Sequence, residues 1–273
     1  EVIVVNDCSN DHTDLVLGTL LKKYKNLRTT SIAEDKKFSH GKKLALVVGI
    51  KAAKYETLVF TDADCKPLTN QWLSRISAKF TGKVSIVLGY GRYTKSKGLL
   101  NAYIRYETVW IALQYFSYAL FGIPYMGVGR NLAYKKSFFF AGKGFANHYH
   151  LLSGDDDLFV NENATKTNTS IEYSFESHTE SKPKFNLADW INQKKRHLTT
   201  GRYYKPIHKF LLATEFISRF IYYFTFIWLL IRSYNEVVIL SLFVVRLSYP
   251  GGNNKKSIVN FEREEFVSIF TRF

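Results

Sequence analysis

The feature that most constrains the fold is an alternation of short apolar runs and helical segments in the first part of the chain. Segments 2–5 and 57–61 are rich in β-branched and other apolar residues, which favour strands, and each ends in a polar, acidic stretch. Segments 13–25 and 41–54 carry apolar residues at helical spacing. Strands that alternate with helices form parallel sheets through right-handed crossovers. The sequence therefore predicts an α/β fold with a mostly parallel sheet flanked by helices.

Acidic residues follow two of the predicted strands. Three further elements are expected, namely a strand at 27–32, a helix at 71–80 and a strand at 84–90. Ligands of such sheets bind at the carboxyl ends of the strands. Asp7 follows the first strand, and Asp62 and Asp64 follow the strand at 57–61. All three carboxylates are therefore predicted to lie at the binding edge of the sheet.

Asp62 and Asp64 form the most informative pair. Two carboxylates one residue apart, just past a buried strand, can converge on Mg²⁺ or Mn²⁺, which prefers oxygen ligands and often bridges carboxylates to phosphate. Such an ion neutralises the charge that develops on a departing diphosphate. The alternative is a solvated acidic loop. The apolar run at 57–61 favours the metal site because it fixes the pair at the edge of the sheet.

Two other acidic segments are candidates for the same site. Asp7 could accept hydrogen bonds from a nucleobase or ribose, although Ser9 or Asp11 could simply cap the next helix. The triplet 155–157 brings three carboxylates together, and their repulsion raises the pKa of at least one. One member could act as a general base toward a hydroxyl group. The alternative is a solvated turn or helix N-terminus.

The formal net charge of the chain is +15. Such an excess of positive charge is typical of proteins that bind nucleic acids, anionic membranes or anionic substrates. The positive charges of residues 1–100 are dispersed and no nucleic-acid-binding motif is found, so nucleic acid is not an expected partner. A basic cluster precedes an apolar segment and consists of Lys194, Lys195, Arg196, Arg202, Lys205 and Lys209. This placement favours a membrane surface and a cytosolic orientation.

Three apolar segments follow the predicted sheet. Segment 99–121 is predicted to be a helix, either buried or lying in a membrane interface. Segment 210–231 is long enough for a bilayer, which needs about 20 mostly apolar residues. Its charged residues Glu215 and Arg219 are four apart and can pair on one helix face. Segment 237–245 could form the return leg of a hairpin. We therefore predict a transmembrane or deeply embedded region.

The two cysteines, Cys8 and Cys65, do not have the spacing of a metal site. We interpret them as free thiols in a reducing compartment. The chain starts with a strand-like run and no signal peptide. We expect the natural protein to have more sequence ahead of residue 1.

Six motifs occur in an order typical of one enzyme family. They are VVNDCSNDHT at 4–13, GKKLA at 41–45, VFTDADC at 59–65, GVGRNLA at 127–133, GDDDL at 154–158 and QKKRH at 193–197. Each motif alone is weak, but their joint order resembles the family-2 glycosyltransferases, inverting enzymes with the GT-A fold. The resemblance covers residues 1–205. It implies a Rossmann-like catalytic domain that takes a sugar from a nucleotide-diphosphate sugar with the help of Mg²⁺ or Mn²⁺.

The resemblance also implies roles for individual residues. Asp62 and Asp64 match the metal ligands. The donor-binding positions would be Asp7, Lys42, Asp62, Gln193, Arg196 and His197. The positions beside the donor sugar and acceptor would be Gly129, Arg130 and Asn131. The catalytic base would be Asp156 if the motif is aligned on Gly-Asp-Asp, or Asp155 if it is aligned on Asp-Leu, and Asp156 is preferred.

The resemblance further implies partners and a location. A UDP-sugar is the expected donor, a lipid-linked or glycan acceptor the expected second substrate, and the bacterial inner membrane the expected site, with the catalytic domain facing the cytoplasm. Segment 206–249 would be the membrane-associated region and 250–273 a polar tail. The family's opening strand and helix are absent, Cys8 stands for the usual Gly and His197 for the usual Trp. The small membrane portion argues against a long processive channel.

Two alternatives remain open from the sequence. A nucleotidyltransferase shares the paired-carboxylate metal site and a similar sheet, but it should carry a Gly-rich, Arg-containing loop near its start. A membrane-anchored module that binds nucleotide sugars without catalysis would keep the same motifs. Donor hydrolysis in the presence of Mn²⁺ separates such a module from an enzyme.

Overall fold

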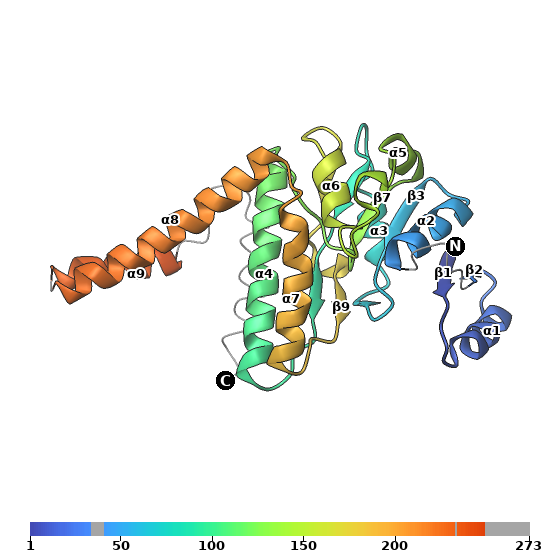
Figure 1. Cartoon of the computed structure of the whole chain (residues 1–273), viewed down its shortest axis with the longest axis horizontal. Coiled ribbons are helices and arrows are strands. Elements are labelled where there is room, and N and C mark those ends of the chain that lie inside the picture. The colour runs from blue at the N-terminus through green and yellow to red at the C-terminus, as the bar shows by residue number, and fades with distance from the viewer. Residues whose placement is uncertain (34–40, 233, 249–273) are drawn as a thin grey trace.

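The computed structural model describes residues 1–33, 41–232 and 234–248 of the chain. Its strands form three small sheets, and two helices near the carboxyl-terminal end leave the body as an arm (Figure 1). The predicted polar tail, 250–273, lies outside the described residues.

A four-stranded sheet lies at the centre of the body, in the order β3–β7–β5–β8. Its strands are β3 (Thr57–Phe60), β7 (Leu132–Lys135), β5 (Ile86–Leu88) and β8 (Thr169–Ile171). Strand β7 runs antiparallel to both β3 and β5, whereas β5 and β8 are parallel. The prediction of a mostly parallel sheet is therefore wrong, and the α/β fold has a mixed sheet. The chain reaches β7 after the long helix α4 (Leu99–Leu120) rather than by a short crossover.

The N-terminal unit, residues 1–33, contains a two-stranded parallel sheet. Strand β1 (Val2–Asp7) and strand β2 (Leu27–Ile32) pair through the crossover helix α1 (Thr13–Lys23), as predicted. Helix α2 (Lys42–Ala52) packs on β1. Gly49 allows this close approach, since a Cβ at that position would lie 3.1 Å from the Val5 side chain.

The third sheet has the order β4–β9–β6. Its strands are β4 (Lys66–Pro67), β9 (Thr179–Ser181) and β6 (Gly91–Tyr93). The remaining short elements are α3 (Trp72–Ser77), α5 (Lys136–Ala141), α6 (Asp157–Asn163) and the 3₁₀ turns η1 (Ala146–His148) and η2 (Phe175–Ser177).

Helix α4 confirms the predicted helix at 99–121 and is buried on one face. Val109 and Phe116 are fully buried in the main core, and the Tyr115 hydroxyl donates to the Gly89 carbonyl at 2.7 Å. The opposite face exposes Tyr103. Helix α7 (Leu187–Gly201) lies beside α4, because Lys194 Nζ is 2.6 Å from a carboxylate oxygen of Glu107. The buried interpretation of this segment thus holds for one face of α4.

The arm consists of α8 (Pro206–Ile231) and α9 (Glu236–Ser248), which fold back on each other (Figure 1). The Phe226 and Phe243 rings stack at 4.5 Å between centroids. The predicted hairpin and the pairing of Glu215 with Arg219 are both confirmed. Helix α8 is long and apolar enough to cross a membrane, and none of its apolar window is buried.

Candidate active site

Asp62 and Asp64 lie in a turn just after β3, where the amide of Cys65 donates to the Asp62 carbonyl at 2.9 Å. The side-chain ligand atoms of Asp62, Asp64 and Cys65 all lie within 4.8 Å of one another. Burial and the two carboxylates raise the pKa of the Cys65 thiol, which keeps the sulfur protonated and a poor metal ligand. The group therefore offers paired carboxylate oxygens, a donor set that suits Mg²⁺ or Mn²⁺.

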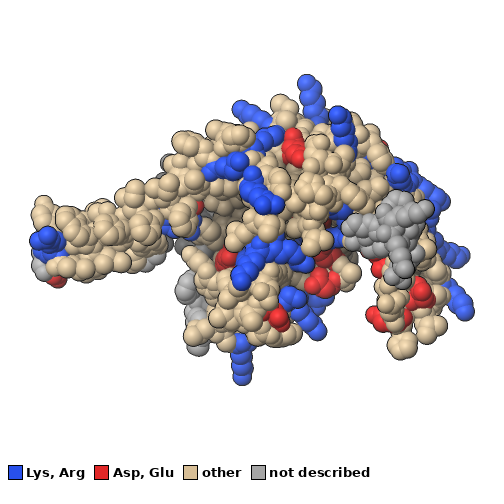
Figure 2. All heavy atoms as spheres, in the orientation of Figure 1, with Lys and Arg blue, Asp and Glu red and all other residues tan. Residues whose placement is uncertain are grey.

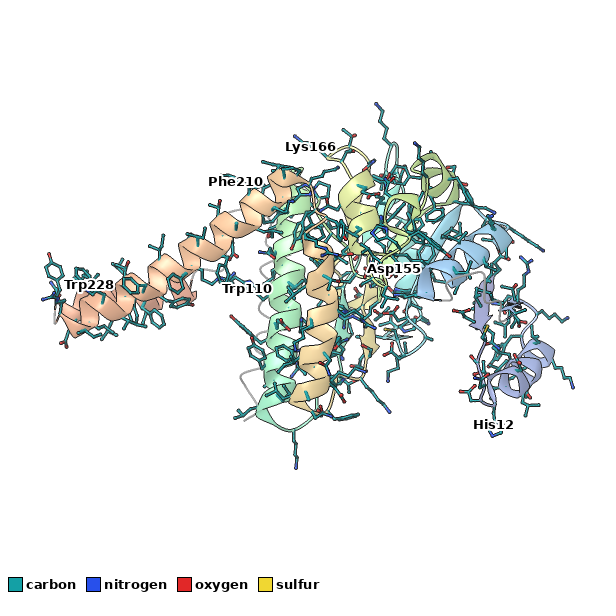
Figure 3. All side chains as sticks on the ribbon, in the orientation of Figure 1. His12, Trp110, Asp155, Lys166, Phe210 and Trp228 are labelled. Atoms are coloured by element: carbon teal, nitrogen blue, oxygen red, sulfur yellow. The ribbon has the colours of Figure 1, made fainter. Side chains whose placement is uncertain are left out.

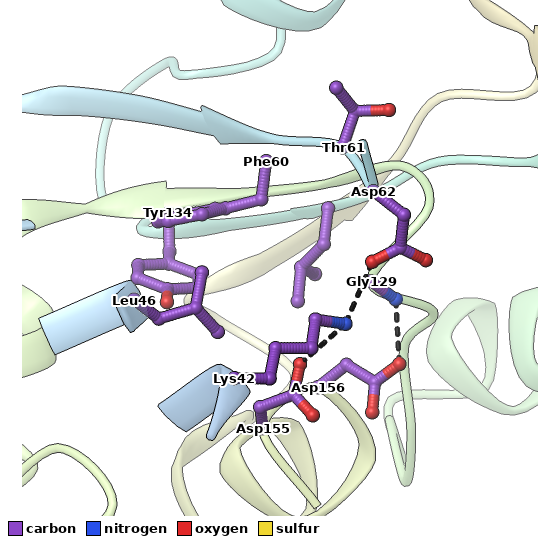
Figure 4. A pocket seen from close by; sticks show the side chains of 10 residues that line it. Lys42, Leu46, Phe60, Thr61, Asp62, Gly129, Tyr134, Asp155 and Asp156 are labelled. Atoms are coloured by element: carbon purple, nitrogen blue, oxygen red, sulfur yellow. Dashed lines mark hydrogen bonds and ion pairs between the residues drawn. The ribbon is translucent and has the colours of Figure 1, made fainter. Parts of the chain in front are cut away.

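Lys42 joins two acidic segments that are far apart in the sequence (Figure 4). Its Nζ lies 2.7 Å from Asp62 Oδ1 and 2.8 Å from Asp155 Oδ2. Burial alone would lower the pKa of Lys42, but the carboxylates of Asp155, Asp156 and Asp62 together raise it. Lys42 is therefore a permanent cation that holds the two segments at one place.

Asp156 is held by backbone amides at the start of α6. Its Oδ2 accepts from the Gly129 amide at 2.6 Å, and its Oδ1 accepts from the Asp157 amide at 2.8 Å. Burial and the neighbouring Asp157 raise the pKa of Asp156. A Cβ at Gly129 would lie 3.0 Å from Lys42 Nζ and 3.3 Å from Asp156 Oδ2. A glycine at position 129 thus leaves room for both charged groups.

Asp157 has a different, structural task. It accepts hydrogen bonds from the hydroxyls of Thr200 and Tyr204, the latter at 2.8 Å. These partners lie at the end of α7 and just before α8. The three adjacent carboxylates are therefore distinct, with Asp155 paired to Lys42, Asp156 lining the site and Asp157 tying α6 to the base of the arm.

These groups line a small cavity (Figure 4). The charged wall contains Lys42, Asp62, Asp155 and Asp156, next to the Gly129 backbone. The apolar wall contains Leu46, Phe60, Leu132 and Tyr134. The Phe60 and Tyr134 rings stack at 4.3 Å between centroids. None of these four apolar residues was predicted to line the site. Phe60 and Leu132 nevertheless lie inside the motifs at 59–65 and 127–133 that were assigned to it.

Lys43 is a second residue that sequence reasoning missed. It is buried, and its Nζ donates to the carbonyls of His148 and Leu151 at 2.5 and 3.0 Å. These carbonyls belong to the loop that leads into Asp155. Lys42 and Lys43 thus act on opposite sides of the same acidic segment, the first through its carboxylate and the second through its loop.

Helix α7 places the motif at 193–197 near the third sheet. Gln193 Nε2 is 3.5 Å from the Tyr93 hydroxyl, a long contact, and the Arg130 guanidinium lies over the Tyr93 ring at 4.3 Å. Desolvation and nearby cations, including Lys194, Arg196, Arg130 and Lys42, lower the pKa of His197 to about 4. His197 is nevertheless accessible to solvent, and it is neutral at pH 7. The cations around it form a positive patch close to the carboxylates.

The side-chain amide of Asn131 is engaged in hydrogen bonds within the fold. Its Nδ2 donates to the carbonyls of Tyr90 and Ser177, and its Oδ1 accepts from the Trp72 indole at 3.0 Å. Gly89 makes space for it, since a Cβ there would lie 2.5 Å from the Asn131 amide carbon. Asn131 therefore joins the central sheet to α3 and η2. Its predicted place beside the donor sugar stays a prediction.

Asp7 ends β1 and does not line the cavity. The next residue, Cys8, has a φ of +55°, in the left-handed region that favours glycine. The usual glycine of the resembled motif fits this backbone. The Cys8 thiol donates to the Ile32 carbonyl at 3.1 Å, and neither Cys8 nor Cys65 is in a disulfide, as expected. The role of Asp7 toward a nucleotide stays a prediction.

Comparison with known proteins agrees with this geometry. The family model described as Glycosyl transferase family 2 matches residues 1–148. A mannosyltransferase from Pyrobaculum calidifontis, PcManGT, solved in complex with GDP-Man and Mn²⁺, has a TM-score of 0.56 and 19% identity, with 72% of this chain and 52% of that chain covered. At this identity the likeness shows a shared fold.

A second solved structure, S. aureus TarS 1–349 in complex with UDP-GlcNAc, has a TM-score of 0.45 and 17% identity, covering 68% of this chain and 50% of that chain. The chain thus spans about half the length of these two structures. No curated protein matches it.

Proposed function

Because the chain belongs to glycosyl transferase family 2, a family of transferases that use nucleotide sugars, we propose that it transfers a sugar from a nucleotide-diphosphate sugar to an acceptor hydroxyl, with inversion and with the help of Mg²⁺ or Mn²⁺. A UDP-sugar is the expected donor. The observation that carries the proposal is the Lys42 bridge, which brings Asp62 and Asp155 to one cavity beside Asp156. The family match favours this reaction over nucleotidyl transfer.

The donor would bind beside the turn after β3. Asp62 and Asp64 would hold the metal ion, which when bound neutralises charge on the diphosphate. Arg196 would bind the departing diphosphate through its guanidinium, whose planar fork suits phosphate oxygens. His197 would offer a neutral ring and a hydrogen bond rather than charge, because its pKa is lowered to about 4.

Asp156 would be the catalytic base. It accepts the proton of the acceptor hydroxyl while the oxygen attacks the anomeric carbon on the face opposite the diphosphate, so the anomeric configuration inverts. Its raised pKa makes it a better proton acceptor than an ordinary carboxylate. Asp155 is less suited to this role, since its carboxylate is tied to the Lys42 ammonium.

Asp64→Asn and Asp156→Asn test the two roles separately. We expect each variant to lose at least about 100-fold in nucleotide diphosphate release, since base catalysis alone contributes about 100- to 10,000-fold. Asp156→Asn should still bind the nucleotide diphosphate in calorimetry with Mn²⁺, whereas Asp64→Asn should not. Glu176→Gln, which changes a half-buried carboxylate outside the cavity, is the matched control.

The assay should screen nucleotide sugars with and without EDTA. Near-normal turnover in Asp156→Asn would refute its role as base. Release of pyrophosphate rather than nucleotide diphosphate would indicate the nucleotidyltransferase. Binding of donors without release of either product would indicate the non-catalytic module.

The proposal includes the membrane of a bacterial cell, with the catalytic domain on the cytoplasmic face of the inner membrane and a lipid-linked or glycan acceptor of the cell envelope. Two features support it. Few charged side chains lie along the arm between its base and its tip, and Lys and Arg gather on the body near its base (Figure 2). An anionic cytoplasmic surface attracts such cations. Co-sedimentation of the chain with vesicles containing phosphatidylglycerol tests it.

A further inference from the structure

Aromatic side chains on α4 and α7 form a group that α8 contacts through Arg219. The rings of Tyr106 and Trp110 on α4 stack at 6.4 Å, and Tyr103 on the same helix meets Trp190 of α7 edge-on at 5.5 Å. We call these four residues the aromatic belt. The Arg219 guanidinium of α8 lies over the Trp110 ring at 4.5 Å. Trp and Tyr are enriched where proteins cross the headgroup level of a bilayer.

Beyond the belt, the two helices of the arm have matching lengths. From Arg219 to Ile231, α8 rises about 18 Å at about 1.5 Å per residue. Helix α9 has 13 residues and rises about 20 Å on the same basis. The hydrocarbon core of a bilayer is about 30 Å thick. Neither leg of the arm is therefore long enough to cross it from the level of the belt.

The described surface of the arm beyond the belt is mostly apolar, with Thr225 and Ser241 as exposed polar residues. Its exposed apolar residues include Phe220, Ile221, Phe224, Ile227, Trp228 and Ile231 on α8 and Val237, Val238, Leu240, Leu242 and Val244 on α9. A helix that is apolar all round needs an apolar environment on every side. An arm lying flat on a membrane would expose much of this surface to water, so the pattern indicates insertion.

In the sequence, cations flank the arm on both sides, which favours contact with a single anionic membrane surface. Lys205 and Lys209 precede the apolar part of α8, and in the sequence Lys255 and Lys256 follow α9. Cations near both ends of an embedded segment favour the same anionic face. The tip carries opposite charges on Arg232 and Glu236, and the Arg232 guanidinium lies 5.8 Å from the centre of the Trp228 ring.

We propose that the α8–α9 arm is a re-entrant anchor, which enters and leaves an anionic bilayer through the same face, with the aromatic belt at headgroup level. This inference rests on the membrane association proposed above and replaces the expected transmembrane span with a shallower one. It also places the candidate active site. Helix α7 carries Trp190 in the belt, and its Thr200 donates to Asp157, so this helix would join the headgroup level to the acidic segment of the site.

Single cysteines test the depth of the tip. Cys8 and Cys65 are changed to serine, and Asn235→Cys at the tip or Tyr203→Cys on the body is added. The proteins are reconstituted with vesicles of phosphatidylcholine and phosphatidylglycerol at 3:1 and treated with a membrane-impermeant maleimide. We expect Tyr203→Cys to react from outside. Asn235→Cys should react only after detergent, whether the reagent is outside or trapped inside. Tyr234→Cys is a second tip variant in case Asn235→Cys does not fold.

Each other outcome overturns the anchor. Reaction of the tip with trapped reagent would show that the arm crosses the bilayer, and reaction from outside would show that it is not embedded. A chain that does not float with the vesicles but dimerises through the arm would show that a second copy covers it. Release of nucleotide diphosphate by the unmodified chain is measured in parallel. Because this readout does not depend on where the tip lies, failure of the anchor and failure of glycosyl transfer are distinguishable.

Discussion

The N-terminal unit and the central four-stranded sheet both carry residues of the predicted site, but they are packed very differently. In the N-terminal unit, no residue of α1 is buried, and Asn6 is the buried residue of β1. In the central sheet, Ile86, Val87 and Leu88 of β5 are all 0–1% exposed. The side of the site that holds Asp156 and the Lys42 bridge is thus supported by a densely packed core, whereas Asp7 belongs to a unit with few buried residues.

This difference indicates how the two sides behave. Stability is distributed unevenly in proteins, and regions with few buried apolar contacts open most easily. We expect the N-terminal unit to open locally without unfolding of the core. A nucleotide bound at Asp7 would then stabilise this unit more than any other part of the molecule.

The largest expected difference comes from truncating one large apolar side chain in each region. Phe159 is fully buried and lies among the rings of Tyr134, Phe139 and Phe145. Phe159→Ala should lower the free energy of unfolding by about 3–5 kcal/mol, because it leaves a cavity. Leu15 is 72% exposed on α1, so Leu15→Ala should change it by less than about 0.5 kcal/mol.

Urea unfolding of both variants, followed by circular dichroism, measures this difference. Equal losses in the two variants would show that α1 packs on a surface outside the described residues. The N-terminal unit would then not be less well packed than the core.

A smaller, opposite response to pH is expected in the two regions. The Lys54 amide and Arg28 lower the pKa of Glu1, and hydrogen bonds from Thr13 lower the pKa of Asp11. Their contributions are present at neutral pH and are lost as the pH falls below the ordinary values of 4.5 and 3.8 and through the folded pKa values. Acidification should therefore loosen the N-terminal unit.

Burial raises the pKa values of Asp155, Asp156 and Asp157. Their ionisation costs stability, which is fully regained below 3.8 and lost as the pH rises through the folded pKa values. Hydrogen exchange, corrected for intrinsic rates, should show protection of segment 2–32 falling as the pH drops from 4.5 to below 3.8, while protection of α6 is kept or increased. Parallel losses in both regions would contradict the opposite signs.

The smallest expected effect concerns Cys8, whose φ of +55° strains any residue with a Cβ. The left-handed conformation costs a non-glycine residue about 1–2 kcal/mol. Cys8→Gly and Cys8→Ala both lose the thiol bond to Ile32, so their difference reports the relief of strain less the greater backbone entropy that Gly loses on folding. Cys8→Gly should protect segment 2–32 more strongly than Cys8→Ala, by about 1 kcal/mol in hydrogen exchange. Equal protection would show that the unit relaxes around this residue.

Local patterns predicted most elements of the fold. The strand at 27–32 matches β2 residue for residue, and the helices at 13–25 and 41–54 match α1 and α2 within a few residues. Strand direction was not predictable in the same way, because the same short apolar run can form a parallel or an antiparallel strand. The reversed β7 therefore required the structure.

The sequence predicted which residues form the site, but not the contacts that they make within it. Asp62, Asp155 and Asp156 do meet. Lys42, which the resemblance assigns to donor binding, pairs with two of these carboxylates, and its role toward a donor stays a prediction. The structural role of Asp157, which differs from the roles of its two neighbours, depends on Thr200 and Tyr204. These residues are distant in sequence and contact Asp157 only in the folded chain. Contacts of this kind have no local signature.

The bonds from Thr200 and Tyr204 to Asp157 also bear on how such an enzyme would find its substrate. They join the residue after the proposed base directly to the root of the arm, so the two cannot drift apart without breaking buried hydrogen bonds. With the arm in a lipid layer, catalysis would be confined to a plane. The search for an acceptor would then be two-dimensional, and its rate would follow the surface density of the acceptor rather than its concentration in bulk.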